Sequence, residues 1–470
     1  MTPDAPALAA GAPALVAGAR PAAVRGRDVL VDGALRPATL VLADGRVTAV
    51  EPYDAVVPGA CDVPDGHVVL PGVVDSHVHV NEPGRTAWEG FASATRAAAR
   101  GGVTTIVDMP LNSVPPTTTV AGLEAKRDAA ARAGLGVDVA MWGGAVPGNV
   151  RDLAGLWDAG VMGFKCFLSP SGVPEFGHLD APMLDAHLRE VARLGALMIV
   201  HAEDPDELDA APHGASPSYQ AFLASRPDTA ETAAIARLID AVRRTGARTH
   251  LLHLSSARAL DMLADARAEG LPITVETCHH YLCFAAETIP DAAPQLKCCP
   301  PIRSEANRDL LWQALADGVI DCVVSDHSPS TAAEKLRGDG DLQAAWGGIS
   351  GLEVGFTALA DEARRRGVGL ADVSRWTSAA TAALVGLDGG GGADRSGPPA
   401  KGSLGVGTAA DLIVYDPTRR VVVDQEALAH RNPISAYHGR ELQGAVTTTL
   451  LGGRVLDLDA PTGGALLSRP

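Results

Sequence analysis

The chain has 470 residues, of which 46% are hydrophobic, and a formal net charge of −17 at pH 7. This length allows two or three average domains, or one large barrel with an appendage, and the acidic balance argues against nucleic acid as a partner. Seven cysteines without a C-x-x-C pair favour a reducing compartment over a disulfide framework. No apolar run approaches the roughly 20 residues of a membrane helix. We therefore expect a cytoplasmic globular protein without a membrane partner.

The two ends of the chain have a similar β-rich texture. Residues 1–19 are rich in Ala, Pro and Gly and lack the basic start of a secretory signal, so we interpret them as a disordered N-terminal extension. Short apolar strands separated by turns follow in residues 20–70 and return in residues 400–460. Both segments together predict one small β-sandwich domain. Its strand candidates are residues 28–31, 39–42, 46–50, 410–416 and 445–451.

The middle of the chain, residues 71–386, alternates strands with amphipathic helices. This alternation predicts a parallel sheet, and eight units favour a (β/α)₈ TIM-like barrel. A doubly wound open sheet is the alternative, although no G-x-G-x-x-G follows the first strand. Residues 387–399 resemble a Gly/Pro-rich linker. Strand candidates are the opening stretch 68–79 and residues 104–108, 137–141, 163–167, 197–201, 249–253, 273–276 and 322–326; helix candidates include 89–100, 182–194, 229–244 and 256–269.

Two histidines close the opening stretch. His77 and His79 are two residues apart, so in a strand their imidazoles point to the same face and could bind one metal ion. Two histidines in a strand are more often ordinary half-buried residues, so this pair alone is a modest signal.

Residues at the ends of later strands strengthen the metal-site interpretation of His77 and His79. In a barrel of this kind the chemistry lies at the carboxyl ends of the strands. Four further groups stand at such ends: Lys165, His201, His253 and Asp326. Singly, a histidine there can be a core residue and an aspartate can cap a helix. Six such groups at the ends of five strands instead predict a metal centre.

Lys165 is flanked by apolar residues, so its amine is expected to be buried. A protonated lysine cannot bind a metal, but burial favours the neutral amine, which can react with carbon dioxide. The resulting carbamate could bridge two cations. His77, His79 and Asp326 would then hold one ion, and His201 and His253 the other. Ligands without a thiolate suit zinc, while cobalt, iron and manganese stay open.

These residues resemble the motifs of the amidohydrolase superfamily, in its cyclic-amidohydrolase branch of allantoinases, dihydropyrimidinases (hydantoinases) and dihydroorotases. The resemblance covers about residues 25–457 and matches the H-x-H motif, the carbamylated lysine, two later histidines and the catalytic aspartate, in order. It implies two divalent metal ions, a carbamate on Lys165, and Asp326 as the residue that transfers the proton. Relatives are commonly tetramers or dimers, so a homo-oligomer is expected.

Within this branch the chain most resembles allantoinases, which implies that allantoin is hydrolysed to allantoate. Dihydroorotases usually carry Arg where Asn81 stands, and hydantoinases carry a tyrosine soon after the lysine, whereas none occurs between Lys165 and Glu175. Residues 81–91, 109–113 and 163–176 also look like allantoinase. A hydantoinase or dihydropyrimidinase acting on related cyclic ureides is the near alternative. A non-catalytic assembly protein of the same fold is a third, disfavoured by the intact ligand set.

The resemblance also suggests how a cyclic ureide is held. Main-chain groups near Cys299 and Gly347 would contact the ring, with Asn112 and Ser169 as further candidates. Asn112 could equally be a turn residue and Ser169 a helix cap. Two departures from the family pattern are His279, where Pro is usual, and Cys299, where Ser is common. The adjacent Cys298 and Cys299 could form a redox switch, but plain packing is the simpler interpretation.

Overall fold

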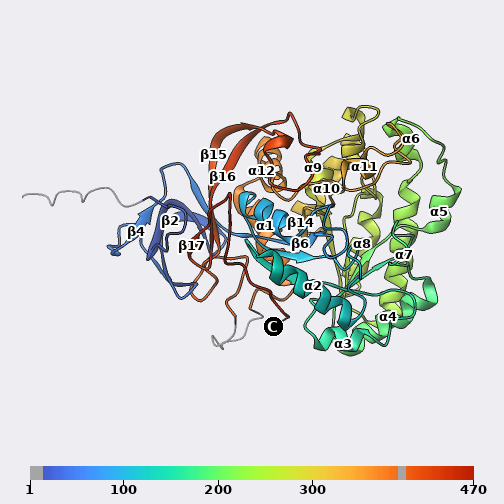
Figure 1. Ribbon diagram of the computed structural model, residues 1–470, viewed down its shortest axis with the longest axis horizontal. Helices are drawn as coiled ribbons and strands as arrows, with labels where there is room; N and C mark the ends of the chain where they lie inside the picture. Colours follow the sequence, from blue (N-terminus) through green and yellow to red (C-terminus); the bar gives the residue numbers. More distant parts are fainter. Residues whose placement is uncertain (1–13, 390–397, 470) are drawn as a thin grey trace, which may run out of the picture.

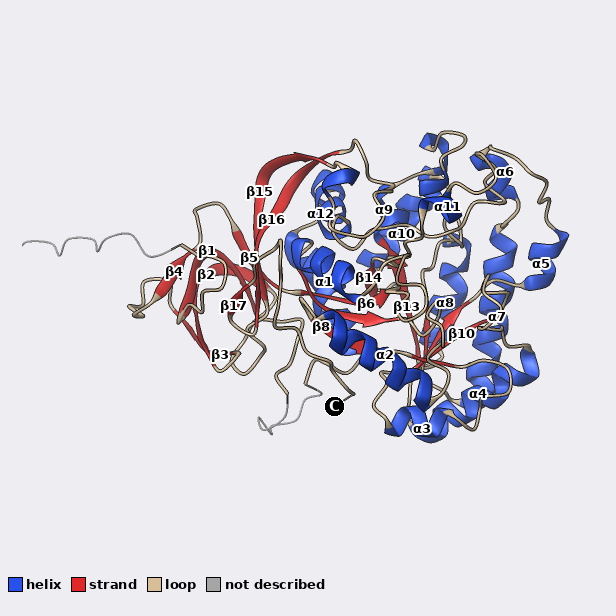
Figure 2. Cartoon of the chain, viewed as in Figure 1, coloured by secondary structure: helices blue, strands red, loops and turns tan. Residues whose placement is uncertain are grey.

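The computed structural model describes residues 14–389 and 398–469. They form a barrel with a smaller β-sheet unit at one side, which Figure 1 shows on the left in blue and red. Figure 2 shows the barrel strands surrounded by helices. The predicted α/β class, a TIM-like barrel with a small β-domain built from both chain ends, is confirmed.

The barrel strands pair in parallel in chain order. A parallel bridge between Val78 and His327 joins the last strand to the first. This closure rules out the open doubly wound sheet. The strands are β6 (Val73–Val78), β7 (Val103–Asp108), β8 (Asp138–Met141) with its continuation β9 (Gly143–Gly144), β10 (Phe164–Phe167), β11 (Met198–His201), β12 (Thr249–Leu251), β13 (Ile273–Cys278) and β14 (Cys322–Val324).

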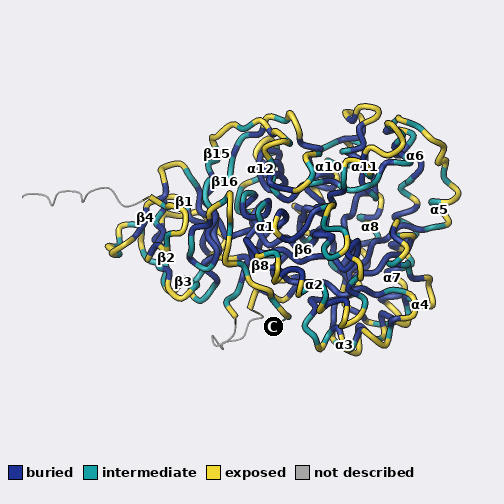
Figure 3. The backbone as a smooth tube through the Cα atoms, in the orientation of Figure 1, coloured by how far each residue is buried: buried dark blue, intermediate teal, exposed yellow. Residues whose placement is uncertain are grey.

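Helices cover the outside of the barrel and bury one face against it, as the dark inner faces in Figure 3 show. Several begin at a residue whose side chain caps a free backbone N–H, as Thr119, Asp180 and Ser304 do. The helices are α1 (Phe91–Arg100), α2 (Val120–Ala133), α3 (Leu153–Asp158), α4 (Ala181–Leu194), α5 (Pro205–Ala210), α6 (Tyr219–Ala224), α7 (Asp228–Thr245), α8 (Leu260–Ala268), α9 (His279–Cys283), α10 (Glu305–Ala316), α11 (Ala332–Lys335), α12 (Gly355–Arg365), α13 (Leu370–Ser374) and α14 (Ala380–Leu384).

The smaller sheet takes strands from both ends of the chain, in the order β17-β16-β15-β5-β1-β2-β3, with β4 beside β1. Its own apolar core includes Val29, Leu40, Val69, Leu412 and Leu450. The strands are β1 (Ala23–Val31), β2 (Ala34–Ala43), β3 (Arg46–Glu51), β4 (Ala60–Asp62), β5 (Val68–Pro71), β15 (Leu412–Val422), β16 (Glu441–Leu451) and β17 (Arg454–Val455).

The opening stretch 68–79, which we predicted as one strand, is two strands in two sheets. β5 pairs with β15 in the small sheet, and β6 begins the barrel directly afterwards. The chain changes sheet at Gly72, where a Cβ atom would lie 2.3 Å from Oγ1 of Thr104. Only glycine fits so close a contact.

Two predicted segments lie partly outside the described residues. Of the extension predicted at 1–19, residues 14–19 are described, and they lie against the small sheet: Gly18 N–H donates to Val455 O at 2.9 Å, and Val455 N–H donates to Ala19 O at 2.9 Å. Residues 390–397 of the predicted linker are not described. The ends of the linker are close together, since Lys401 N–H donates to Leu387 O at 2.7 Å.

After β17 the chain returns to the barrel, which the sequence did not indicate. Leu467 N–H donates to Val139 O at 2.8 Å, so the C-terminal segment lies beside β8. Within the described ranges, the helices lack the combination of length and apolar character that crossing a bilayer requires.

Candidate functional site

The six predicted metal ligands converge at the carboxyl ends of the barrel strands. His77 and Lys165 lie within β6 and β10, and His201 is the last residue of β11. The strands predicted at 249–253 and 322–326 end earlier, so His253 and Asp326 stand two residues beyond β12 and β14. Both adopt a left-handed backbone, with φ of 37° and 42°. This turn of the chain, uncommon for residues other than glycine, places their side chains at the rim.

One group consists of His77, His79 and Asp326. Nε2 of His77 lies 3.1 Å and Nε2 of His79 lies 3.6 Å from Oδ1 of Asp326. One ligand atom of each residue lies within 4.8 Å of the others, and all three residues are buried. Two imidazole nitrogens and a carboxylate oxygen at this spacing suit a divalent ion such as zinc.

The second group stands beside the first. Nδ1 of His201 lies 3.0 Å from Nε2 of His253, and the His253 ring centroid is 5.5 Å from that of His77. The Lys165 amine lies 3.4 Å from Nε2 of His77, at the first group. The structure therefore brings together all six predicted groups. Ring and amine nitrogens lie close to one another, at His201 and His253 and at Lys165 and His77, and such pairs suit a shared cation.

A buried carboxylate lies behind one histidine of each group, and the sequence analysis missed both carboxylates. Oε1 of Glu276 lies 2.6 Å from Nδ1 of His77. Oε2 of Glu203 lies 2.8 Å from Nε2 of His201. Each carboxylate accepts from the nitrogen that faces away from the cluster, which leaves the other nitrogen free to bind a metal. The position of Glu203, two residues after His201, was an available sequence signal.

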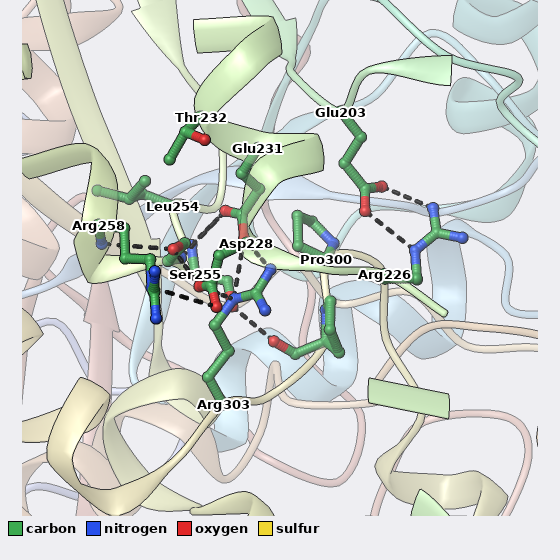
Figure 4. A network of polar contacts seen from close by, with 12 residues as sticks. Glu203, Arg226, Asp228, Glu231, Thr232, Leu254, Ser255, Arg258, Pro300 and Arg303 are labelled. Carbon is green, nitrogen blue, oxygen red and sulfur yellow. Dashed lines mark hydrogen bonds and ion pairs between the residues drawn. The ribbon is translucent and has the colours of Figure 1, made fainter. Parts of the chain in front are cut away.

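Arg226 neutralises Glu203. Its Nε and Nη2 atoms donate to the two carboxylate oxygens at 3.0 and 2.6 Å, the paired contact drawn on the right of Figure 4. Burial opposes the charge on Glu203, yet Arg226 and His201 hold the pKa of its carboxyl below the usual value. Glu203 is thus a fixed anion behind His201.

The remaining network in Figure 4 supports the loop after His253. Glu231 on α7 accepts hydrogen bonds from the backbone N–H groups of Ser255 and Ser256 at 3.0 and 3.1 Å. Arg303 donates to the same glutamate at 2.6 Å. This buried ion pair holds the chain just beyond the left-handed turn at His253.

Burial and neighbouring charges determine the protonation state of the candidate ligands. Burial holds the pKa of His79 well below the usual value, with Lys165 adding to the effect. Burial likewise lowers the pKa of His253, and His201 contributes. Although burial opposes the charge on Asp326, the neighbouring His77 keeps the pKa of the carboxyl well below the usual value. Burial opposes the charge on His77 as well, but Asp326 and Glu276 raise the pKa of this imidazole. The neutral imidazoles of His79 and His253 and the ionised carboxylate are the forms that bind metal ions.

Burial also lowers the pKa of Lys165 to about 8, even though Asp326 opposes the shift. On the order of one tenth of this amine is therefore neutral at pH 7, far more than for an ordinary lysine. The residue is 1% exposed, and its side chain lines the cavity.

A cavity of about 350 Å³ opens above the cluster. Five of the six groups line it, namely His79, Lys165, His201, His253 and Asp326. Three of the predicted substrate contacts line it as well: Asn112, Cys299 and Gly347. This volume is within the range of small-molecule sites.

Ser169, the fourth predicted contact, does not line this cavity. It is fully buried, and its hydroxyl has no hydrogen-bond partner among the described residues. Ser171 lines the cavity instead, and its hydroxyl donates to Phe176 O at 2.5 Å. The turn after β10 points the earlier serine into the protein.

Asn81 supports Asn112 from below the cavity. The Asn112 amide donates to Oδ1 of Asn81 at 3.0 Å, and both residues have a left-handed backbone, with φ of 65° and 66°. The Asn81 amide donates to Pro329 O at 3.3 Å. Asn81 is fully buried, so it holds neighbouring loops together and does not line the cavity.

The chain was compared with known proteins. Residues 68–456 match the amidohydrolase family. Among curated relatives, the allantoinase of Streptomyces avermitilis is 54% identical over 451 residues, covering 95% of this chain and 98% of the relative. The allantoinase of Saccharomyces cerevisiae is 41% identical over 454 residues, covering 93% and 95%. Among solved structures, the L-hydantoinase (dihydropyrimidinase) from Arthrobacter aurescens matches with a TM-score of 0.84 and 28% identity, covering 95% of this chain and 97% of that one.

Proposed function

Because the chain belongs to the amidohydrolase family and is a hydrolase of cyclic amides, we propose that it opens the ring of allantoin to give allantoate. The observation that carries this proposal is the convergence of six nitrogen and oxygen groups, five of which line one cavity. The curated relatives of 54% and 41% identity, both allantoinases, support this choice of substrate.

We assign the ligands of two divalent ions as follows. His77, His79 and Asp326 hold one ion, and His201 and His253 hold the other, each histidine through the nitrogen that faces the cluster. Lys165, as a carbamate, would supply a carboxylate that both ions could share, supported by the burial of its amine and its lowered pKa. Zinc suits this donor set best, and cobalt, iron or manganese would also fit.

Bound ions of this kind lower the pKa of a water molecule to about 7 and polarise a carbonyl oxygen. The protein supplies the proton transfer. Asp326 is ionised and lies on the cavity wall, so its carboxylate can accept a proton and then donate it to the leaving ring nitrogen. Ser328 O–H donates to Oδ1 of Asp326 at 2.9 Å and orients the carboxylate.

The ring is held by Cys299, Gly347 and Asn112, which line the same cavity. Main-chain groups at the first two positions bind the ring, with the Asn112 side chain as a further contact from the cavity wall. Ser169 is no longer part of this proposal because its side chain is buried away from the cavity.

A hydantoinase activity on related cyclic ureides is the second candidate, favoured by the fold neighbour. The identity to that neighbour, 28%, is well below the 54% to an allantoinase. We further propose a homo-oligomer in the cytoplasm, where the seven cysteines, all free, would stay reduced.

Metal removal and return tests this function. The protein is treated with a chelator, divided, and supplied with zinc or with buffer before incubation with allantoin. We expect allantoate only in the metal-supplied sample, and none from an Asp326→Asn variant treated in the same way. Ring opening by protein from which all metal has been removed would contradict the proposal.

A further inference from the structure

The chain uses lysine in an unusual way. It contains five lysines among its 39 basic Lys and Arg residues, and each of the five is buried. A buried ammonium group is costly unless it is paired. Every lysine therefore calls for a structural reason, because none serves as an ordinary solvated surface charge.

The burial of three of the lysines has a clear structural reason. Lys126 pairs with Asp108 at 2.5 Å. Lys401 pairs with Asp138 and Asp411 at 2.8 and 2.5 Å. Lys165 belongs to the metal cluster described above.

Lys297 and Lys335 are different, since no carboxylate of the described residues lies within ion-pair distance of either amine. Both amines donate to main-chain carbonyls of one short segment, residues 343–348. Lys297 donates to Gln343 O at 3.1 Å and to Ala345 O at 2.6 Å. Lys335 donates to Trp346 O at 2.9 Å and to Gly348 O.

This segment forms one wall of the substrate cavity. The lysines occupy the carbonyls on either side of Gly347, while neither the N–H nor the C=O of Gly347 has a partner among the described residues. Gly348 fixes the C-terminal end of segment 343–348, because its N–H donates to Lys297 O at 2.9 Å and its φ is 113°. The polar main-chain groups of Gly347 are thus left available at the cavity.

We propose that Lys297 and Lys335 are positioning residues that hold segment 343–348 in the shape with which the Gly347 main chain binds the substrate ring. This inference rests on the proposed function only for the identity of the ring. Both lysines act through the backbone; Lys297 also lines the cavity whereas Lys335 does not, so the Lys335 variants isolate the positioning role.

A neutral amine is sufficient for this role. Burial lowers the pKa of Lys335 to about 7, with Cys298 and Cys299 opposing the shift and Lys297 adding to it. The neutral amine keeps two N–H donors, which is the number that its two carbonyls require. The positioning role therefore depends on the N–H donors and on the length of the lysine side chain rather than on its charge.

The test compares Lys335→Met, Lys335→Gln and Lys297→Met with the wild-type protein. Loss of two hydrogen bonds to the segment should raise KM for allantoin roughly 10- to 100-fold in the Met variants, with kcat changed much less. Lys335→Gln keeps amide N–H donors and should recover part of the loss. Metal content should stay at the wild-type level in all three variants.

Lys401→Gln is the matched control, because it removes a buried amine that pairs with carboxylates and does not line the cavity. It should lower thermal stability and leave KM unchanged. Hydrogen exchange at the Trp346 and Gly348 amides should quicken in Lys335→Met and in Lys297→Met but not in the control.

An unchanged KM in both Lys335→Gln and Lys297→Met would overturn the inference, even if Lys335→Met fails to fold. If the wild-type protein opens a different cyclic ureide and not allantoin, the proposed substrate is wrong. The same variants are then measured with that ring, so the two failures remain distinguishable.

Discussion

Oε1 of Glu276 lies 2.6 Å from Nδ1 of His77, deep below the cavity. The other carboxylate oxygen, Oε2, lies 3.0 Å from Nε2 of His250. Glu276 is therefore held between two imidazoles and fixes which nitrogen of His77 faces Asp326. Glu203 and His201 repeat this arrangement in the second group, with Arg226 in place of the second imidazole.

Glu276→Gln should weaken metal binding at the first group. Partners of this kind orient a ligating histidine, and their loss typically costs about 10- to 100-fold in metal affinity or activity. The measurement is metal content after dialysis against a graded series of chelator concentrations. Glu362→Gln, which removes a buried carboxylate that pairs with Arg366 and lies away from the cavity, serves as the control. Equal metal retention in the wild-type protein and Glu276→Gln would show that Glu276 is dispensable.

Lys165→Ala should lose most bound metal and activity, because no other group near the cluster could bridge two cations. Metal analysis per subunit measures the loss. A small carboxylate such as acetate, added with zinc, should restore part of the activity by taking the place of the carbamate. Full loading with two ions in this variant would refute the bridging role.

Asp326→Asn should keep the fold and lose turnover, because an amide cannot accept the proton. Acid–base transfer supplies about 10²- to 10⁴-fold, and disturbed metal binding adds to the loss. Turnover is compared at equal metal content, with Ser328→Ala as a milder control that removes only the hydrogen bond to the carboxylate. Near-normal turnover in Asp326→Asn would assign the proton transfer to another residue.

His279 should make the protein sensitive to acid. Both ring nitrogens are buried without a partner among the described residues, and burial, aided by His280, lowers the pKa to about 3. Between pH 3 and 6.5 the unfolded state binds a proton that the folded state does not. The stability that His279 contributes is therefore complete above pH 6.5 and falls as the pH decreases through this window.

His279→Pro should reduce this dependence. His279 is the first residue of α9, and Cys278 before it is extended, so proline fits the backbone there. The slope of unfolding free energy against pH should fall by about 1.4 kcal/mol per pH unit inside the window. Denaturant unfolding followed by tryptophan fluorescence measures it, and an unchanged slope would show that another group dominates acid unfolding.

The sequence was sufficient to predict that the candidate metal ligands meet, because a barrel places strand ends together. Alternating strands and helices located those ends, and reading the residues there found the six candidates His77, His79, Lys165, His201, His253 and Asp326. The strand bounds at His253 and Asp326 were wrong by two residues. Left-handed turns at the rim depend on tertiary contacts, such as Leu254 N–H donating to Glu276 O at 2.8 Å, which no local pattern predicts.

The residues behind and around the site were less predictable. Glu276 lies in a strand whose pattern indicates only burial, and its contact with His77 joins residues that are 199 positions apart. Ser169 was assigned to the cavity from the family resemblance, but its side chain is buried away from the cavity. The contacts of Lys297 and Lys335 with one loop are likewise long-range packing.

The choice of allantoin as substrate is the central claim, and one comparison of substrates tests this choice most directly. The metal-loaded protein is assayed with allantoin, hydantoin, dihydrouracil and dihydroorotate, and kcat/KM is determined for each ring. A site that hydrogen-bonds a substrate arm rejects analogues that lack the arm by large factors, because its polar groups are left unpaired. We predict a kcat/KM for allantoin well above the other three; equal efficiency with hydantoin or dihydrouracil would contradict the account and favour a hydantoinase.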